Sequence, residues 1–250
     1  MYFLIYEKIS HYSVYTKEMK WLVLLLLLSL GIITFVLSMN KQQSTASIRY
    51  VAIGDSYSIG EGASERESWP RVLTEHLKQD GIDIELVANP SVTGWTTQDV
   101  IDKELAVFDN ADPTFATVQI GVNDWVRGVS EEAFTENLII ILDRMQAKLP
   151  DPENIVIVTI PDFSVTPNGK RYSSGRDISA GIASFNSILV QEAKKRNLEI
   201  VDVYPLTQQM QGDLVAPDGL HPSAKEYALW EKEIYPVVKM KILDATESKK

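Results

Sequence analysis

Short apolar runs alternate with stretches of helical periodicity along most of the chain after residue 47. The runs are rich in valine and isoleucine and mostly lack the strict alternation of a strand with one solvated face. Such runs are typical of strands that are buried on both faces of a sheet. The predicted strands are residues 49–53, 84–88, 116–120, 155–160 and 199–203.

Helical periodicity fills the gaps between these strands. In the third helical stretch an apolar residue recurs every three or four positions, which predicts one buried face. The predicted helices are residues 69–79, 97–108, 131–149, 178–196 and 223–243. Pro236 lies inside the last of them, so we expect that helix to be bent or interrupted there. Strands alternating with helices predict an α/β fold, with a parallel sheet, right-handed crossovers and helices on both faces.

Residues 21–38 form an uncharged apolar segment of 18 residues, which is long enough to cross a membrane. It predicts a transmembrane anchor or a signal segment, and the lack of a clear cleavage site favours the anchor over a secreted product. Lys17 and Lys20 precede it, which places the following domain outside the cytoplasm. Met19 is a second candidate for the translation start. The predicted organisation is tail 1–20, anchor 21–38, linker 39–47, domain 48–243 and polar tail 244–250.

Charge and composition exclude several classes of function. The net charge is -10 and no basic cluster follows the apolar segment, which argues against a nucleic acid partner. The chain has no cysteine, so disulfides, thiolate metal sites, a cysteine nucleophile and lipidation on cysteine are all excluded. The sequence has neither convincing metal-ligand spacing nor a nucleotide-binding glycine loop, so we expect no metal and no cofactor.

Polar segments follow the predicted strands. Residues 54–56 (Gly-Asp-Ser), 89–94 and 121–124 come directly after the first, second and third strands, and residues 218–221 precede the last helix. Sites in open parallel sheets form at the carboxyl ends of the strands. We therefore expect these four segments to meet at one rim.

Ser56, Asp218 and His221 are candidates for a catalytic triad of nucleophile, orienting carboxylate and general base. His11 precedes the apolar segment and His76 lies in a predicted helix, so His221 is the plausible base among the three histidines. An unperturbed histidine has a pKa of about 6.5, which suits a general base. Taken singly, the serine is more typical of a helix cap and the histidine of a surface position. Their joint pattern favours catalysis.

The four segments resemble the signature blocks of the SGNH hydrolases, also called GDSL-type esterases and lipases. Ser56, Gly94, Asn123 and His221 match the name-giving positions, and the resemblance spans about residues 48–240. It implies a flavodoxin-like, three-layer α/β/α sandwich with strand order 2-1-3-4-5. It also implies an oxyanion hole made by the backbone N–H groups of Ser56 and Gly94 and the side-chain amide of Asn123.

The chain departs from the common family pattern at two loops. Ser91, preceded by Pro90, stands where the family often has glycine, and Val122 replaces a frequent threonine. Neither change removes a catalytic group. We expect the loop before Gly94 to differ in shape.

Residues near these blocks have two possible roles each. Asp55 and Asp124 are expected to organise loops by accepting backbone N–H bonds. Trp95 and Trp125 either flank the site, as walls for an acyl chain or a sugar, or pack within their loops. Residues 163–177 predict a rim or lid whose cations contact an anionic head group, or else a plain surface loop.

Other acidic and titratable positions are predicted to be structural. Glu131 and Glu132 suit a helix start, and His76 is expected to be exposed. Three further acidic residues are predicted to form a solvated helix face. These are Asp99, Asp102 and Glu104.

Three functions are compatible with the sequence. The first is a serine esterase or lipase, lysophospholipase-like, that cleaves carboxylic esters through an acyl-enzyme. The second is a carbohydrate O-deacetylase or O-acyltransferase on cell-envelope polysaccharide. The third is a non-catalytic binding module on the same fold. The expected partners are a small-molecule, lipid or glycan ester and a membrane contacted through residues 21–38.

Overall fold

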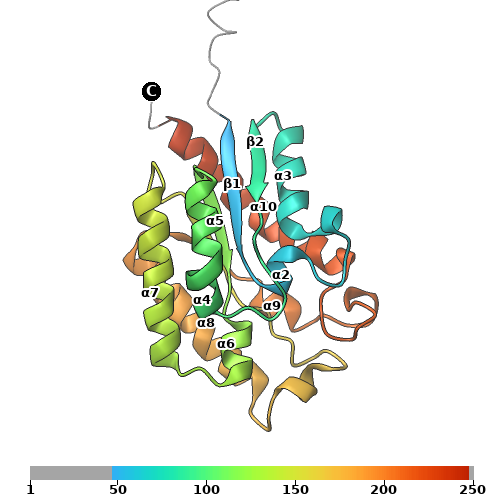
Figure 1. Ribbon diagram of the computed structural model, residues 1–250. Coiled ribbons are helices and arrows are strands. Elements are labelled where there is room, and N and C mark those ends of the chain that lie inside the picture. The colour runs from blue at the N-terminus through green and yellow to red at the C-terminus, as the bar shows by residue number, and fades with distance from the viewer. Residues whose placement is uncertain (1–46, 248–250) are drawn as a thin grey trace, which may run out of the picture. The chain divides into compact units, whose positions relative to one another are not determined.

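A single sheet of five parallel strands organises the computed structural model, which describes residues 47–247. The strand order is β2-β1-β3-β4-β5, which confirms the predicted order 2-1-3-4-5 (Figure 1). The strand bounds are β1 Ile48–Gly54, β2 Ile84–Ala88, β3 Phe115–Gln119, β4 Ile155–Val158 and β5 Glu199–Val201.

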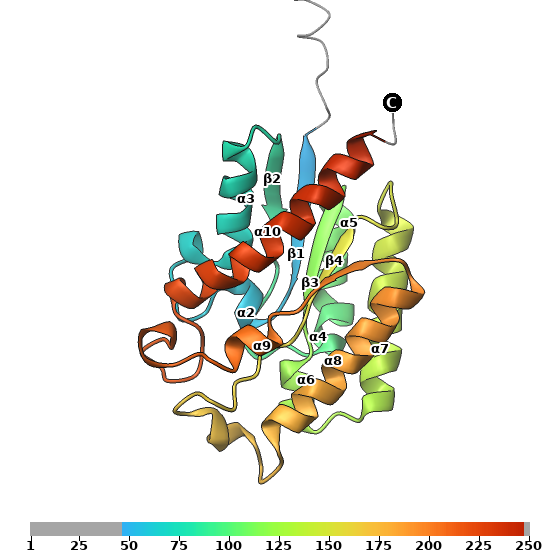
Figure 2. The same ribbon diagram turned by 180° about the vertical axis from the view of Figure 1, so that it is seen from behind.

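Helices cover both faces of the sheet (Figures 1 and 2). On one face α3 (Trp69–Gln79) packs against α10 (Ala224–Glu247). On the other face α7 (Glu131–Lys148) packs against both α5 (Leu105–Asn110) and α8 (Ile178–Lys195). The three-layer arrangement follows from burying both faces of a parallel sheet.

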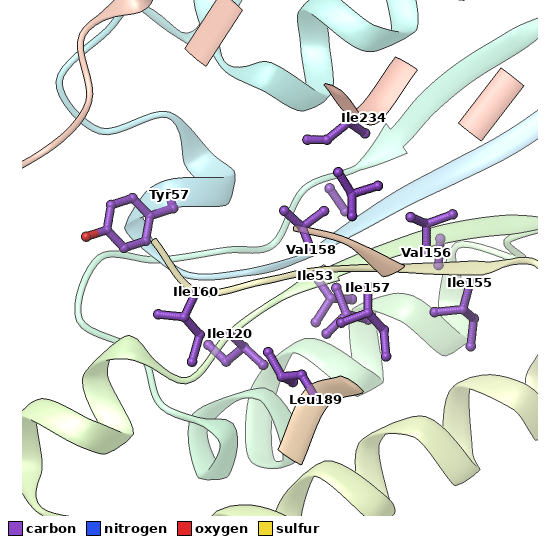
Figure 3. Packing of buried hydrophobic residues seen from close by; sticks show 14 of the residues in the cluster. Ile53, Tyr57, Ile120, Ile155, Val156, Ile157, Val158, Ile160, Leu189 and Ile234 are labelled. Atoms are coloured by element: carbon purple, nitrogen blue, oxygen red, sulfur yellow. The ribbon is translucent and has the colours of Figure 1, made fainter. Parts of the chain in front are cut away.

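The core lies between the sheet and these two helical layers. All four residues of β4 are buried. In Figure 3, Val156 and Val158 point toward the side of Ile234 in α10, while Ile155 and Ile157 point toward the side of Leu189 in α8. Successive side chains of a strand face opposite sides, so an uninterrupted apolar run fills both layers at once.

Shorter helical elements lie in the connections, and several were not predicted. Their bounds are α2 Ser56–Ile59, η1 Glu65–Glu67, α4 Thr97–Asp99, η2 Val100–Glu104, α6 Val122–Arg127, η3 Gly169–Tyr172, α9 Tyr204–Thr207 and η4 Gly212–Leu214. The helix expected at 97–108 is thus three pieces, with the π-helical turn η2 between α4 and α5.

The structure adds detail to two expectations about α10 and its neighbour. Helix α10 runs without interruption past Pro236 to Glu247. Buried Ile234 and Val238 flank the proline, which itself removes one hydrogen bond of the helix. The side chain of His76 is 43% exposed and makes two contacts, because its Nδ1 lies 2.9 Å from Glu231 Oε1 and its ring stacks on Tyr235. It therefore joins α3 to α10.

The N-terminal predictions concern residues that the structure does not describe. The apolar segment 21–38, residues 1–20 and most of the linker 39–47 lie outside the described residues. Within residues 47–247 we find no helix that combines the length and apolar character needed to cross a bilayer.

Candidate active site

The nucleophile candidate emerges at the carboxyl end of β1. Ser56 is the first residue of α2 and is only 4% exposed. Asp55 caps this short helix, because its Oδ1 accepts a hydrogen bond from the backbone N–H of Tyr57 at 3.0 Å. Gly60 ends the helix in the left-handed conformation. The turn from strand to helix thus holds Ser56 at the rim where α2, α4, α6 and α9 gather (Figure 1).

Asp218 and His221 form a tightly organised pair. Asp218 Oδ2 lies 2.6 Å from His221 Nδ1. Its other oxygen accepts the backbone N–H groups of Leu220 at 2.8 Å and His221 at 3.0 Å. Burial opposes ionisation of Asp218, but the hydrogen bonds from His221 and the backbone outweigh it and lower the pKa of this carboxyl. An ionised Asp218 holds the Nδ1–H tautomer, which leaves Nε2 free to accept a proton.

Packing brings His221 to the side of α2. Tyr57 meets the imidazole edge-on, with the ring centres 5.9 Å apart. Gly62, with a φ of +92°, passes so close that a Cβ there would lie 3.2 Å from His221 Cβ. Among the described residues no hydrogen bond yet joins Ser56 Oγ to the imidazole. Catalytic hydrogen bonds are often long before substrate binds.

Backbone donors suited to an oxyanion are available at two of the expected positions. Within residues 47–247, neither the N–H of Ser56 nor that of Gly94 has an acceptor. Gly94 adopts a φ of +83°, which favours glycine, in a turn closed by a bond from Trp95 N to Val92 O at 3.2 Å. Arg127 fixes the turn from outside by donating to Gly94 O at 2.6 Å.

Asn123 connects the Gly94 turn to the segment that carries Ser56. It lies in the first turn of α6, and its Nδ2 donates to Trp95 O at 2.9 Å. The same nitrogen lies 3.4 Å from Asp55 Oδ2. Asn123 is therefore bonded to the residue before Ser56 and to the residue after Gly94.

Asp55 and Asp124 organise loops, as the sequence predicted. Asp124 accepts both the backbone N–H of Thr97, at 2.9 Å, and the hydroxyl of the same residue. Burial raises the pKa of Asp55 to about 8, and the charge of Asp124 contributes to the rise. Asp55 thus links the loop after β1 to the loop after β3 through Asn123. Asp124 links the loop after β3 to the loop after β2 through Thr97.

Glu104 corrects the prediction of a solvated acidic face. It is fully buried at the end of η2, and its Oε2 accepts the N–H of Gly54 at 3.1 Å. Its other oxygen is buried without a hydrogen-bond partner. Burial raises the pKa of Glu104 to about 8, and Asp55 and Asp99 add to the effect. Of the three acidic residues, Asp102 is exposed and Asp99 caps α4 through Thr96.

The two tryptophans differ in their surroundings. Trp125 is 5% exposed, with Arg176 stacked 4.1 Å from its ring and Gly181 so close that a Cβ would meet Nε1 at 1.8 Å. Packing is therefore the favoured alternative for Trp125. Trp95 is half-buried, and the amine of Lys103 lies 4.9 Å from its ring centre.

The loop 163–177 is attached to the turn that carries Asp218 and His221. Asn168 donates from Nδ2 to Asp218 O at 2.6 Å, and from its backbone N–H to Gly219 O at 2.8 Å. The guanidinium of Arg176 forms hydrogen bonds within the protein, since it donates to the backbone carbonyls of Trp125 and Val126. Sequence reasoning missed Asn168, because no local pattern marks a contact between two loops.

A cavity of about 460 Å³ lies beside the segment between α2 and η1. Its apolar lining comes from Ile59, Ala63 and Leu86, and the rest is mostly polar, including Glu61 and Thr93. Glu61 connects this cavity to His221, because one of its carboxylate oxygens lies within 4.8 Å of a ring nitrogen of His221. A second cavity, of about 430 Å³, is lined by Asp151, Glu199 and Lys241 near the opposite ends of β4 and β5.

The burial of Glu104 predicts a pH dependence of stability. The unfolded chain releases this proton near the ordinary glutamate pKa of 4.5, whereas the folded chain keeps it until about 8. Stability should therefore fall as pH rises from about 4.5 to 8, by roughly 3 to 5 kcal/mol for this group. Glu104→Gln keeps an acceptor for Gly54 and removes this part of the fall.

Urea unfolding of wild type and Glu104→Gln between pH 5 and 9 measures the effect. The variant should gain stability relative to wild type as pH rises, while the matched change Asp102→Asn, at an exposed residue of the same segment, should not. Parallel curves for wild type and Glu104→Gln would mean that Glu104 does not hold its proton in the folded state.

Comparison with known proteins agrees with this geometry. The pattern of the GDSL-like lipase/acylhydrolase family matches residues 52–229. The chain is 29% identical over 198 residues to the arylesterase of Vibrio mimicus, covering 78% of this chain and 88% of that protein. It is 23% identical over 181 residues to thioesterase 1/protease 1/lysophospholipase L1 of Escherichia coli K12, covering 72% and 78%.

A solved structure shows the same fold. The psychrotrophic esterase EstA from a Pseudoalteromonas species superimposes with a TM-score of 0.61 at 24% identity, covering 78% of this chain and 98% of EstA. The family pattern, however, carries the assignment, because it extends over more than half of the chain. The protein belongs to the GDSL-like lipase/acylhydrolase family and is a carboxylic ester hydrolase of the serine type.

Proposed function

We propose that Ser56, His221 and Asp218 hydrolyse carboxylic esters through an acyl-enzyme. The observation that carries the proposal is the 2.6 Å bond between Asp218 Oδ2 and His221 Nδ1 beside the helix that begins with Ser56. Ser56 Oγ attacks the carbonyl carbon of the ester while His221 Nε2 takes the hydroxyl proton. Asp218 stabilises the imidazolium that results.

The tetrahedral intermediate carries a negative oxygen that needs donors. The free N–H groups of Ser56 and Gly94 supply two donors, and the amide of Asn123 supplies a third when one of its N–H groups leaves its 3.4 Å contact with Asp55. Collapse of the intermediate breaks the C–O bond, and His221 returns the proton to the departing alcohol. Water, deprotonated by His221, then attacks the acyl-enzyme and releases the carboxylic acid. Each oxyanion donor contributes about 100- to 1000-fold to turnover in enzymes of this kind.

The cavity beside Glu61 supports a small or polar substrate. Only three apolar side chains line it, whereas a long acyl chain needs a continuous apolar surface. The first candidate is therefore a short-chain acyl ester, consistent with the arylesterase relative. The same polar lining supports a second candidate, a carbohydrate O-deacetylase or O-acyltransferase. The family assignment leaves the binding-module alternative without support.

The triad is tested on p-nitrophenyl acetate, butyrate and octanoate. Ser56→Ala and His221→Ala should each lower kcat/KM by about 1000-fold or more, and Asp218→Asn by at least about 100-fold. Ser58→Ala is the matched control, because it removes a neighbouring α2 hydroxyl that has no hydrogen-bond partner. Acetate should be the best substrate. Activity that survives in Ser56→Ala would refute the nucleophile, and preference for octanoate would refute the short-chain assignment.

We also propose that residues 21–38 hold the enzyme at a membrane, with the catalytic domain outside the cytoplasm. The support is the 18-residue uncharged segment and the lysines that precede it. The full-length chain should remain in the membrane fraction after alkaline washing, and protease added to intact cells should remove the domain. Full-length chain in the soluble fraction, or a domain protected from external protease, would contradict this placement.

A further inference from the structure

Glu61 lies beside the catalytic pair but has no part in the mechanism described above. It belongs to the segment between α2 and η1, far in sequence from the turn that carries Asp218 and His221. One carboxylate oxygen of Glu61, one of Asp218 and one ring nitrogen of His221 all lie within 4.8 Å of one another. The imidazole therefore has two carboxylates as close neighbours.

Glu61 is held in place from three directions. Its N–H donates to Ser56 O at 2.9 Å, and its carbonyl accepts the Tyr227 hydroxyl at 2.9 Å. Its carboxylate accepts a hydrogen bond from the hydroxyl of Thr93, the residue before Gly94. Glu61 thus contacts Ser56 through its backbone, and its carboxylate lies close to both Thr93 and His221.

The backbone after Glu61 packs closely against the turn that carries Asp218 and His221. A Cβ on Gly62 would lie 2.6 Å from Ala216 Cβ and 2.6 Å from Pro222 O. These residues flank the catalytic turn. The segment is consequently packed against His221, and the carboxylate cannot swing away without breaking its bond to Thr93.

We propose that Glu61 is a positioning residue for His221, acting as a second carboxylate. Together with Asp218 it stabilises the positive charge that the imidazole acquires when Ser56 transfers its proton. Its bond to Thr93 also keeps the Gly94 turn in place relative to the histidine. The inference rests on the proposed role of His221 as the general base.

The charges around the imidazole support this role. Asp218 faces the ring from its own turn, Glu61 from the segment after α2, and the Tyr57 ring meets it edge-on from α2. Tyr227 of α10 reaches only the carbonyl of Glu61. In the part of the chain that is described, no lysine or arginine forms an ion pair with Glu61 or Asp218. The negative charge near the histidine is therefore not neutralised.

A shared cation is a weaker explanation for the cluster. The Oδ2 of Asp218 is already engaged by His221 Nδ1, and an oxygen of Glu61 by Thr93. A cation there would have to compete with both hydrogen bonds. Stabilising an imidazolium requires neither bond to break.

The test compares Glu61→Gln, Glu61→Asp and Thr93→Val with wild type, using p-nitrophenyl acetate across pH 5 to 9. Glu61→Gln keeps an acceptor for Thr93 and removes only the charge. It should lower kcat by about 5- to 50-fold with little change in KM. It should also move the acid limb of the kcat/KM profile to lower pH, because protonated His221 loses a stabilising neighbour.

The other variants separate charge from structure. Glu61→Asp should restore part of kcat and return the acid limb toward the wild-type position. Thr93→Val keeps the charge, so its acid limb should not move. The matched control Glu75→Gln changes an exposed carboxylate of α3 that does not line the cavity beside Glu61, and should leave kcat and the profile unchanged.

Two results would overturn the inference. One is a Glu61→Gln profile that superimposes on wild type in both kcat and acid limb. The other is a loss of kcat that is equal in Glu61→Gln and Thr93→Val without movement of either acid limb, which would leave Glu61 only a structural tie. Full activity in His221→Ala would instead refute the proposed triad, so the two failures are distinguishable.

Discussion

The close packing at the carboxyl end of β1 is the constraint on which the rest of the site depends. A side chain on Gly54 would place its Cβ 2.1 Å from Ser58 Oγ and 2.5 Å from Gln119 O. Gly54 is paired with Gln119 in the β1–β3 register, and its N–H is bound by Glu104. The sheet therefore sets the direction in which the chain leaves β1, and Ser56 follows two residues later.

Carboxyl groups surround the nucleophile and the base in two different environments. Asp55 and Glu104 are buried behind Ser56, where desolvation raises the pKa of each to about 8. Asp218 lies at the surface, where hydrogen bonds lower its pKa. Buried carboxyls that hold protons can fix the nucleophile turn without adding charge, whereas the ionised Asp218 supplies charge where an imidazolium forms. Whether a carboxyl group has a structural or a chemical role thus depends on whether it is buried in the fold or lies at the surface.

The strand order that the family resemblance implies is confirmed, whereas the sequence was insufficient for contacts between distant loops. Asp218 and His221 are three residues apart, so a single turn brings them into contact whatever surrounds it. Glu104 was predicted to be solvated because it belongs to an acidic stretch with Asp99 and Asp102. It is buried because η2 packs against β1. Glu61, Thr93 and Asn168 carry no local signal either. Their roles arise from the way the sheet brings separate loops to one rim.

The identity of the nucleophile can be measured by covalent labelling. The full-length enzyme is treated with a reactive phosphonate ester, which phosphonylates an activated serine, and the modified peptide is located by mass spectrometry. The structure predicts a single adduct on Ser56, formed in step with loss of esterase activity and absent from Ser56→Ala and His221→Ala. An adduct on Ser58 or Ser91, or full inhibition with Ser56 unmodified, would contradict the assignment.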